Sequence, residues 1–172
     1  MADARIACRI CRAKGETPMN CRTDKSMYAP NETVCVYVDG LPAETVSLRL
    51  ILLHLEKTVL TEEIAAAERF SLLPPAKDGK GYLLEVQALD PDKALLADAF
   101  TAIDVSSAWT RFPRYGYVWD FTPGVDAQAK IETLCRFHIN GLQFYDWQYR
   151  HHRPVADDTS VWKDWSGRTV SG

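Results

Sequence analysis

The amino-acid sequence predicts a chain of two parts, an all-β sandwich followed by the beginning of a parallel α/β unit. Across residues 20–105, short stretches of alternating apolar and polar residues are separated by turn-forming residues at regular spacing, which is typical of a sandwich. After Val105 a strand, a turn, a helix and a second strand follow in that order, which is the sequence of a βαβ unit.

The clearest strand of the first part covers residues 33–39. Val34, Val36 and Val38 fall on one face of that stretch and more polar residues fall on the other, which is the period of a half-buried strand. Residues 29–32 contain proline followed by asparagine, and this pair predicts a turn immediately before the strand.

The other strands of the sandwich follow from the same alternation and from the turns between them. The alanine-rich residues 61–69 allow either a short helix, on propensity, or an irregular strand. Together the strands occupy about 85 residues, which suits one immunoglobulin-like unit. The expected positions are a polar extended segment at 23–28 and strands at 45–55, 82–88 and 98–105.

The second part begins with an aromatic linker and contains all five tryptophans of the chain. Asp126 is placed to cap the helix or to complement its dipole, and Gly141 supplies a permissive backbone position where the helix ends. The expected elements are a linker at 106–114, a strand at 115–121, a helix at 125–137 and a strand at 142–146.

The densest run of aromatic and polar residues lies at the carboxyl end of the second expected parallel strand, where α/β enzymes place their binding sites. Aromatic rings pack on the C–H face of a sugar, while carboxylates and imidazoles bind its hydroxyls. Strand alternation puts Gln143 and Tyr145 on one face, toward a barrel interior, and Leu142 and Phe144 on the other. The candidate substrate-binding residues are Asp120, Tyr145, Asp146, Trp147, Tyr149, His151 and His152.

Each candidate also has a structural explanation. A strand-end carboxylate such as Asp120 can cap a helix or pair with a cation, and the aromatic residues can be packing. His151 and His152 are adjacent in the sequence, so their side chains point apart and do not suit one metal ion. We therefore predict no metal site at this strand end.

Charge and hydropathy exclude two classes of partner. The formal net charge of −3 provides no basic field for nucleic acid or for an anionic membrane surface. The longest apolar stretch, residues 48–55, is interrupted by Arg49 and His54, and it is far shorter than the ~20 residues of a membrane span. We predict neither a nucleic-acid nor a membrane partner.

Residues 1–21 form a cysteine-containing leader without the apolar stretch of a secretory signal. Cys8 and Cys11 are spaced as a C-x-x-C pair, but a zinc site needs a second well-spaced pair of ligands. The five cysteines are odd in number, which argues against a disulfide framework. We therefore predict reduced thiols, no structural zinc and no cofactor.

Three stretches of the chain resemble glycoside hydrolase family sixty-six. Residues 105–117 (VSSAWTRFPRYGY) look like its domain junction, and residues 136–154 (RFHINGLQFYDWQYRHHRP) carry its longest and most specific motif. Residues 23–34 (TDKSMYAPNETV) are similar to the opening strands of its N-terminal immunoglobulin-like domain. The likeness covers residues 22–172 and leaves the leader unmatched.

This resemblance implies a fold order and a chemistry. The family has an N-terminal β-sandwich, then a (β/α)8 barrel and further β-domains, and it contains dextranases and cycloisomaltooligosaccharide glucanotransferases. The implied substrate is α-1,6-linked glucan or an isomaltooligosaccharide. The implied mechanism is retaining, with an aspartate nucleophile and a glutamate acid/base whose carboxyl groups are about 5–5.5 Å apart.

The chain departs from the family pattern in its length. A (β/α)8 barrel takes about 250 residues, and only about sixty follow the junction. No residue matches the catalytic pair, so we assign none. The expected fold is a β-sandwich (immunoglobulin-like) domain at 22–105, followed at 106–172 by the first strand–helix–strand part of an incomplete (β/α)8 barrel.

The likeness implies that the chain is the N-terminal part of a glycosidase or glucanotransferase that acts on α-1,6-linked glucan. We expect this part to be inactive alone, and its expected partner is the missing remainder of the barrel. The alternative is a non-catalytic glucan-binding module. The likeness implies an extracellular location, although the leader is not a signal peptide. Two strands cannot close a barrel, so we also expect residues 115–121 and 142–146 to expose apolar faces.

Overall fold

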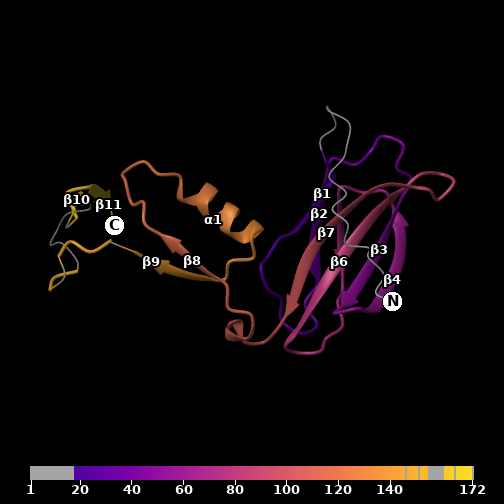
Figure 1. Cartoon of the computed structure of the whole chain (residues 1–172), viewed down its shortest axis with the longest axis horizontal. Helices are drawn as coiled ribbons and strands as arrows, with labels where there is room; N and C mark the ends of the chain where they lie inside the picture. Colours follow the sequence, from indigo (N-terminus) through magenta and orange to yellow (C-terminus); the bar gives the residue numbers. More distant parts are fainter. Residues whose placement is uncertain (1–17, 146, 151, 155–160, 165, 172) are drawn as a thin grey trace, which may run out of the picture.

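The computed structural model of the chain describes residues 18–145, 147–150, 152–154, 161–164 and 166–171 (Figure 1). The larger part of the molecule is built on two β-sheets, and a narrower part with the one described α-helix extends from them. The strands of the larger part are β1 (Asn20–Thr23), β2 (Val34–Asp39), β3 (Ser47–His54), β4 (Lys57–Ala65), β5 (Arg69–Leu72), β6 (Lys80–Leu89) and β7 (Leu95–Val105).

The larger part is a β-sandwich of two antiparallel sheets. One sheet has the strand order β1-β2-β5 and the other has the order β4-β3-β6-β7. Alternate residues of both sheets point inward and form one core, as the valines of β2 and the leucines of β3 predicted. The largest side chains that are almost completely buried are Tyr28, Val34, Val36, Val38, Leu48, Leu50, Leu52, Leu84, Val86, Leu89, Ile103 and Val105.

Two sequence expectations change in this region. The alanine-rich stretch is not a helix, because residues 57–65 pair with β3 along their whole length. The first strand is Asn20–Thr23 rather than residues 23–28, since the chain bends after Thr23. Met19 and Cys21 lie in the sandwich core, so the ordered fold includes the last residues of the segment read as a leader.

Tyr28 ties the start of the sandwich to its last strand. Its backbone N–H donates to the carbonyl of Asp104 at 2.9 Å, and its carbonyl accepts from Ser106 at 2.8 Å. Its hydroxyl donates to Asp24 at 2.6 Å, and burial together with that hydrogen bond raises the pKa of the phenol. The end of β7 is therefore bonded to the segment between β1 and β2, just before the chain enters the linker.

The linker forms a short 3₁₀ turn, η1 (Trp109–Arg111), and then leads into a parallel βαβ unit. This unit consists of β8 (Tyr115–Val118), α1 (Ala127–Arg136) and β9 (Gly141–Phe144). β8 and β9 pair in parallel, with Tyr117 opposite Gln143. The predicted strand, helix and strand are thus confirmed, and a hairpin that was not predicted follows, made of β10 (Val161–Lys163) and β11 (Thr169–Ser171).

The helix is capped at both ends by side-chain and backbone contacts. The carboxylate of Asp126 accepts from the Ala129 N–H at 3.0 Å, which confirms the predicted N-cap. At the other end His138 has a φ of 55° and donates to the Cys135 carbonyl at 2.9 Å, while Ile139 donates to Leu134 at 3.1 Å. These two hydrogen bonds form a Schellman motif.

The predicted helix terminator, Gly141, has a different role. His138 takes the left-handed position, and Gly141 begins β9. A Cβ at residue 141 would lie 3.0 Å from the Tyr115 ring and 3.4 Å from the Trp109 ring. Gly141 therefore allows two aromatic side chains to approach the start of β9 closely, and it does not terminate the helix.

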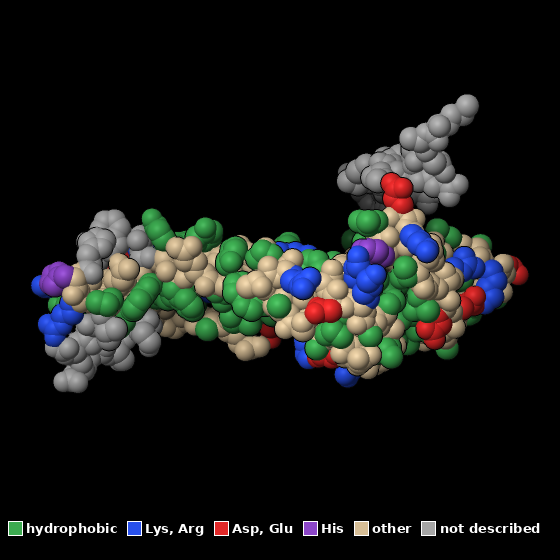
Figure 2. Space-filling view, turned by 90° about the horizontal axis from the view of Figure 1, so that it is seen from below, with side chains coloured by type: hydrophobic (Ala, Val, Ile, Leu, Met, Phe, Trp, Pro, Cys, Tyr) green, Lys and Arg blue, Asp and Glu red, His purple; other side chains and the backbone are tan. Residues whose placement is uncertain are grey.

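Large apolar side chains are exposed along the narrow part of the molecule, as predicted for residues 115–121 and 142–146. Figure 2 shows apolar side chains gathered over this part, whereas charged side chains are more frequent over the sandwich. Among the described residues no helix is long and apolar enough to cross a membrane. The exposed large apolar residues of this part include Tyr115, Tyr117, Trp119, Ile131, Phe137, Leu142, Phe144 and Tyr145.

Candidate functional site

An open hollow of about 470 Å³ lies at the carboxyl ends of β8 and β9. The described residues that line it are Tyr117 in β8, Trp119 just after it, Tyr145 just after β9, and Arg168 from the terminal hairpin. The three aromatic side chains are 55–64% exposed, so their rings are accessible to a ligand. We call this feature the aromatic hollow.

Strand alternation puts these rings together. Tyr117 and Trp119 are two residues apart, so they project from the same face of β8. The opposite face meets the helix: a Cβ on Gly116 would lie 2.9 Å from Ile139 and 3.2 Å from Leu134. The aromatic hollow is therefore on the face of the parallel pair that points away from α1, although Tyr117 and Trp119 also line a second hollow that α1 borders.

The second strand follows the alternation predicted from the sequence. Tyr145 lines the aromatic hollow, while Leu142 and Phe144 are on the helix side. There Phe144 stacks on Phe121 with ring centroids 6.0 Å apart. Among the candidate residues that the structure describes, Tyr145 is thus the one that lines the hollow.

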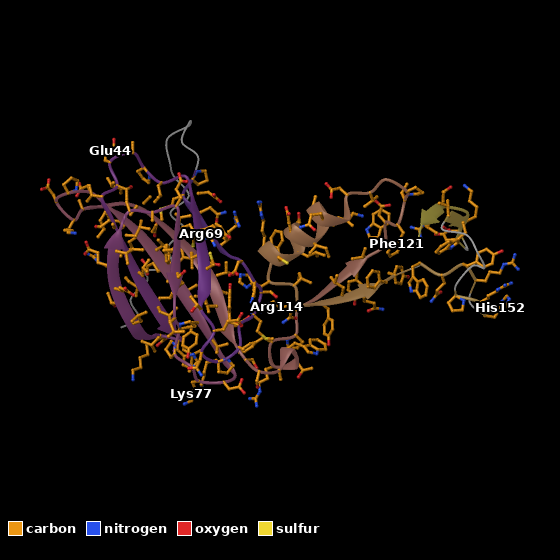
Figure 3. The ribbon with its side chains drawn as sticks, turned by 180° about the vertical axis from the view of Figure 1, so that it is seen from behind. Glu44, Arg69, Lys77, Arg114, Phe121 and His152 are labelled. Atoms are coloured by element: carbon orange, nitrogen blue, oxygen red, sulfur yellow. The ribbon has the colours of Figure 1, made fainter. Side chains whose placement is uncertain are left out.

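The other candidates that follow Tyr145 lie beyond the hollow or outside the described residues. Trp147 and Tyr149 are half-buried, and the Tyr149 N–H donates to the Pro154 carbonyl at 2.9 Å. His152 is exposed in the turn that follows, at the far end of the molecule from the sandwich (Figure 3). Asp146 and His151 fall outside the described residues.

Asp120 pairs with a cation, which was the structural alternative to a role in substrate binding. One carboxylate oxygen accepts from the Thr122 N–H at 3.1 Å and from its hydroxyl at 2.7 Å, and the other lies 3.4 Å from the Lys130 ammonium. The hydrogen bonds from Thr122, followed by those of Lys130, lower the pKa of the Asp120 carboxyl. Asp120 lines a second hollow, of about 370 Å³, between β8 and α1.

Tyr117, Trp119 and Arg168 line the aromatic hollow and were not among the sequence candidates. The alternation of Tyr115, Tyr117 and Trp119 was a signal for the first two, since it predicts one aromatic face on the first parallel strand. No sequence signal points to Arg168, because only the path of the hairpin brings it to this place.

Arg168 is held by a buried carboxylate. Asp164, whose side chain is fully buried, accepts from the Ser166 N–H at 2.9 Å, the Ser166 hydroxyl at 2.8 Å and the Arg168 N–H at 2.9 Å. Its second oxygen accepts from Nε of Arg168 at 2.8 Å. Burial opposes ionisation of Asp164, but the hydrogen bonds from Ser166 and Arg168 outweigh it, and the net effect lowers its pKa.

The described residues contain no group of three or more histidine, cysteine, aspartate or glutamate side chains placed to hold a metal ion. Cys21, Cys35 and Cys135 are free thiols, and burial raises the pKa of Cys21 to about 12. Cys8 and Cys11 lie outside the described residues.

Comparisons with known proteins agree with one another. The sequence model of glycosyl hydrolase family 66 matches residues 23–172. Two cycloisomaltooligosaccharide glucanotransferases of Niallia circulans are 33% and 31% identical over 169 residues. Each alignment covers 87% of this chain, which spans 17% of the length of those relatives.

A solved structure is similar over the same region. It is a cycloisomaltooligosaccharide glucanotransferase of Paenibacillus sp. in complex with cycloisomaltoheptaose, with 34% sequence identity and a TM-score of 0.72. The superposition covers 88% of this chain and 24% of that one. The sandwich and at least part of the following βαβ unit therefore have a counterpart in that enzyme.

Proposed function

This chain belongs to glycosyl hydrolase family 66, and on that basis we propose that it is the N-terminal part of a retaining enzyme that acts on α-1,6-linked glucan. The enzyme is a cycloisomaltooligosaccharide glucanotransferase or a dextranase. The Paenibacillus relative, solved with cycloisomaltoheptaose, supports an isomaltooligosaccharide as the ligand class. An extracellular location follows from a polymeric substrate and belongs to the same proposal.

The proposed architecture follows from family membership and from the connections in this chain. The proposed sandwich is immunoglobulin-like and extends to residue 105, and it begins at Met19 rather than after Cys21. Residues 106–172 are proposed to be a linker with the start of a (β/α)8 barrel. The parallel strands joined through α1 support the barrel assignment, because a helical crossover between parallel strands is the unit from which such barrels are built. The remaining strands of the barrel would pair at the edges of the β8–β9 sheet, so that the exposed rings would lie at the barrel mouth.

The aromatic hollow is the observation that carries the proposal. Three accessible rings and a guanidinium surround a space at the carboxyl ends of parallel strands, which is where (β/α)8 enzymes bind substrate. Glucose presents an apolar C–H face to aromatic rings and hydroxyls to polar groups. We propose that Tyr117, Trp119 and Tyr145 stack on glucose units of the glucan.

The substrate contacts predicted from the sequence form the outer part of the same proposal. Trp147 and Tyr149 follow Tyr145 along the chain, and their half-buried rings would extend the surface beyond the hollow. Asp146, His151, His152 and Asp120 remain candidates for binding glucan hydroxyls. Of these, Asp120 is already engaged by Thr122 and Lys130, so a ligand would have to compete with those contacts.

A binding experiment tests the proposal. We expect isomaltoheptaose to bind the chain and Trp119→Ala to weaken the affinity at least about five-fold, which corresponds to about 1 kcal/mol of lost ring contact. Trp109→Ala is the matched control, since Trp109 is a similarly exposed tryptophan that does not line the hollow. Equal effects of the two substitutions, or no binding by the unaltered chain, would contradict the proposal.

Binding without cleavage is the second candidate function. The described lining of the aromatic hollow contains no carboxylate, and no residue of the chain matches the nucleophile or the acid/base of the family. We therefore expect the 172-residue chain to release neither reducing sugar nor cyclic product from dextran. Retardation in a dextran-containing gel that Trp147→Ala abolishes would support a binding module, and product release would exclude it.

A further inference from the structure

We propose that Arg168, positioned by the buried carboxylate of Asp164, makes the aromatic hollow selective for uncharged, hydroxyl-rich sugars. This inference rests on the proposed function, because it assumes that a saccharide occupies the hollow. It adds a selectivity-determining residue, Arg168, and a positioning residue, Asp164, and both come from the terminal hairpin rather than from the parallel strands.

The first step is the place of Arg168. Among the described residues that line the aromatic hollow, it alone carries a charge, and the other three supply aromatic rings. Its side chain is 40% exposed, but Nη2 is buried and Nε donates to Asp164, so part of the guanidinium is accessible to a ligand in the hollow. A guanidinium is planar and offers several donors, which suits neighbouring hydroxyl oxygens on a sugar ring.

The second step is the way in which Arg168 is held. Asp164 binds both the backbone N–H and the side-chain Nε of Arg168, so the turn and the side chain share one carboxylate. The two contacts from Ser166 fix that carboxylate in turn. A long, flexible side chain is thereby ordered before any ligand arrives, which reduces the entropic cost of binding.

The third step concerns charge. The carboxylate of Asp164 is fully buried 2.8 Å from Nε of Arg168, so the positive charge at the hollow is compensated from behind. A compensated guanidinium still donates hydrogen bonds, but it attracts an anion less than an uncompensated one does. A carboxylate also loses more hydration free energy than a hydroxyl does when it packs against aromatic rings, and without a net positive charge the hollow does not offset that cost. The arrangement therefore favours a neutral sugar over a uronate of the same size.

The experiment compares two ligands of equal length, isomaltotriose and isomaltotriose oxidised to a uronate at C6 of its non-reducing end. We expect the unaltered chain to prefer the neutral sugar and Arg168→Gln to lower that affinity about ten-fold. Asp164→Asn removes the compensating charge, so it should shift the affinity ratio toward the uronate by about ten-fold. If Asp164 has a purely structural role, Asp164→Asn should lower the affinity for both ligands by the same factor and leave the ratio of the two affinities unchanged.

Further variants separate the outcomes. Arg168→Lys keeps the charge but loses the planar set of donors, so we expect it to lower the affinity for isomaltotriose. This variant still tests the role of Arg168 if Asp164→Asn disrupts the hairpin. If Tyr117→Ala abolishes binding while Arg168→Gln and Arg168→Lys leave it unchanged, this inference fails and the proposed function stands. If the unaltered chain binds neither sugar, both fail.

Discussion

Arg114 lies at the boundary between the sandwich and the βαβ unit (Figure 3), and its guanidinium forms an ion pair with the buried carboxylate of Asp104. Asp104 lies at the end of β7, and its side chain is 4% exposed, whereas Arg114 comes immediately before β8. The backbone of Arg114 is bonded as well: its N–H donates to Asn140 and its carbonyl accepts from Gly141. One residue thus links the sandwich to both parallel strands.

Arg114→Met should destabilise the chain, because it leaves the Asp104 carboxylate buried without its partner. We expect a loss of about 2–3 kcal/mol in the free energy of unfolding, somewhat below the value for a fully buried pair since Arg114 is 35% exposed. Lys25→Met removes the cation of a more exposed pair with Glu32, so solvent screening should make its cost clearly smaller than that of Arg114→Met. Equal losses in denaturant titrations would contradict this role of Arg114.

Gly116→Ala should also be destabilising, because the new methyl group would lie 2.9 Å from Ile139 and 3.2 Å from Leu134. We expect a loss of about 1–3 kcal/mol, the usual cost of adding a methyl group to a packed contact. Ile139→Ala opens space at the same point, so the two substitutions together should cost less than the sum of their separate effects. Strict additivity in a double-mutant cycle would rule out the packing of β8 against α1 described above.

Acid should weaken the link between the turn before β6 and the linker. Asp78 accepts from the Ser107 hydroxyl at 2.7 Å and from its N–H at 2.9 Å, and these bonds lower its pKa from 3.8 to about 2. Because the folded-state pKa is the lower one, the stabilisation is complete above about pH 4 and is lost as the pH falls toward about 2. Ser107→Ala removes the hydroxyl bond and keeps the N–H bond, so it should return the carboxyl pKa in an NMR titration part of the way toward 3.8. An unchanged value would exclude the hydroxyl bond as a cause.

Cysteine reactivity provides a test of the first strand. Cys21 is 5% exposed in the sandwich core, and burial raises its pKa to about 12, so little thiolate forms near neutral pH. Cys35 and Cys135 are half-buried. We expect an alkylating reagent to label Cys21 after these two in the native chain and at a similar rate after unfolding, as followed by mass spectrometry. Early labelling of Cys21 in the native chain would show that β1 is not part of the packed core.

The periodicity of the sequence predicted much of the fold because it reports which side of an element is buried. The alternating valines of β2 and leucines of β3 both point into the core, and Asp126 caps α1 as expected. The same alternation placed Tyr145 on the face that lines the aromatic hollow. Propensity alone was ambiguous for the alanine-rich stretch, and pairing with β3 made it a strand.

The sequence by itself determined the two-part architecture, the parallel βαβ order and the family, since each of these depends on local spacing or on a contiguous motif. Only the tertiary structure decided which residues share the site. Arg168 reaches Tyr117 and Trp119 through a hairpin about fifty residues later in the chain, and Asp104 reaches Arg114 across the domain boundary. Such contacts depend on how distant elements pack, and no periodicity along the chain encodes that.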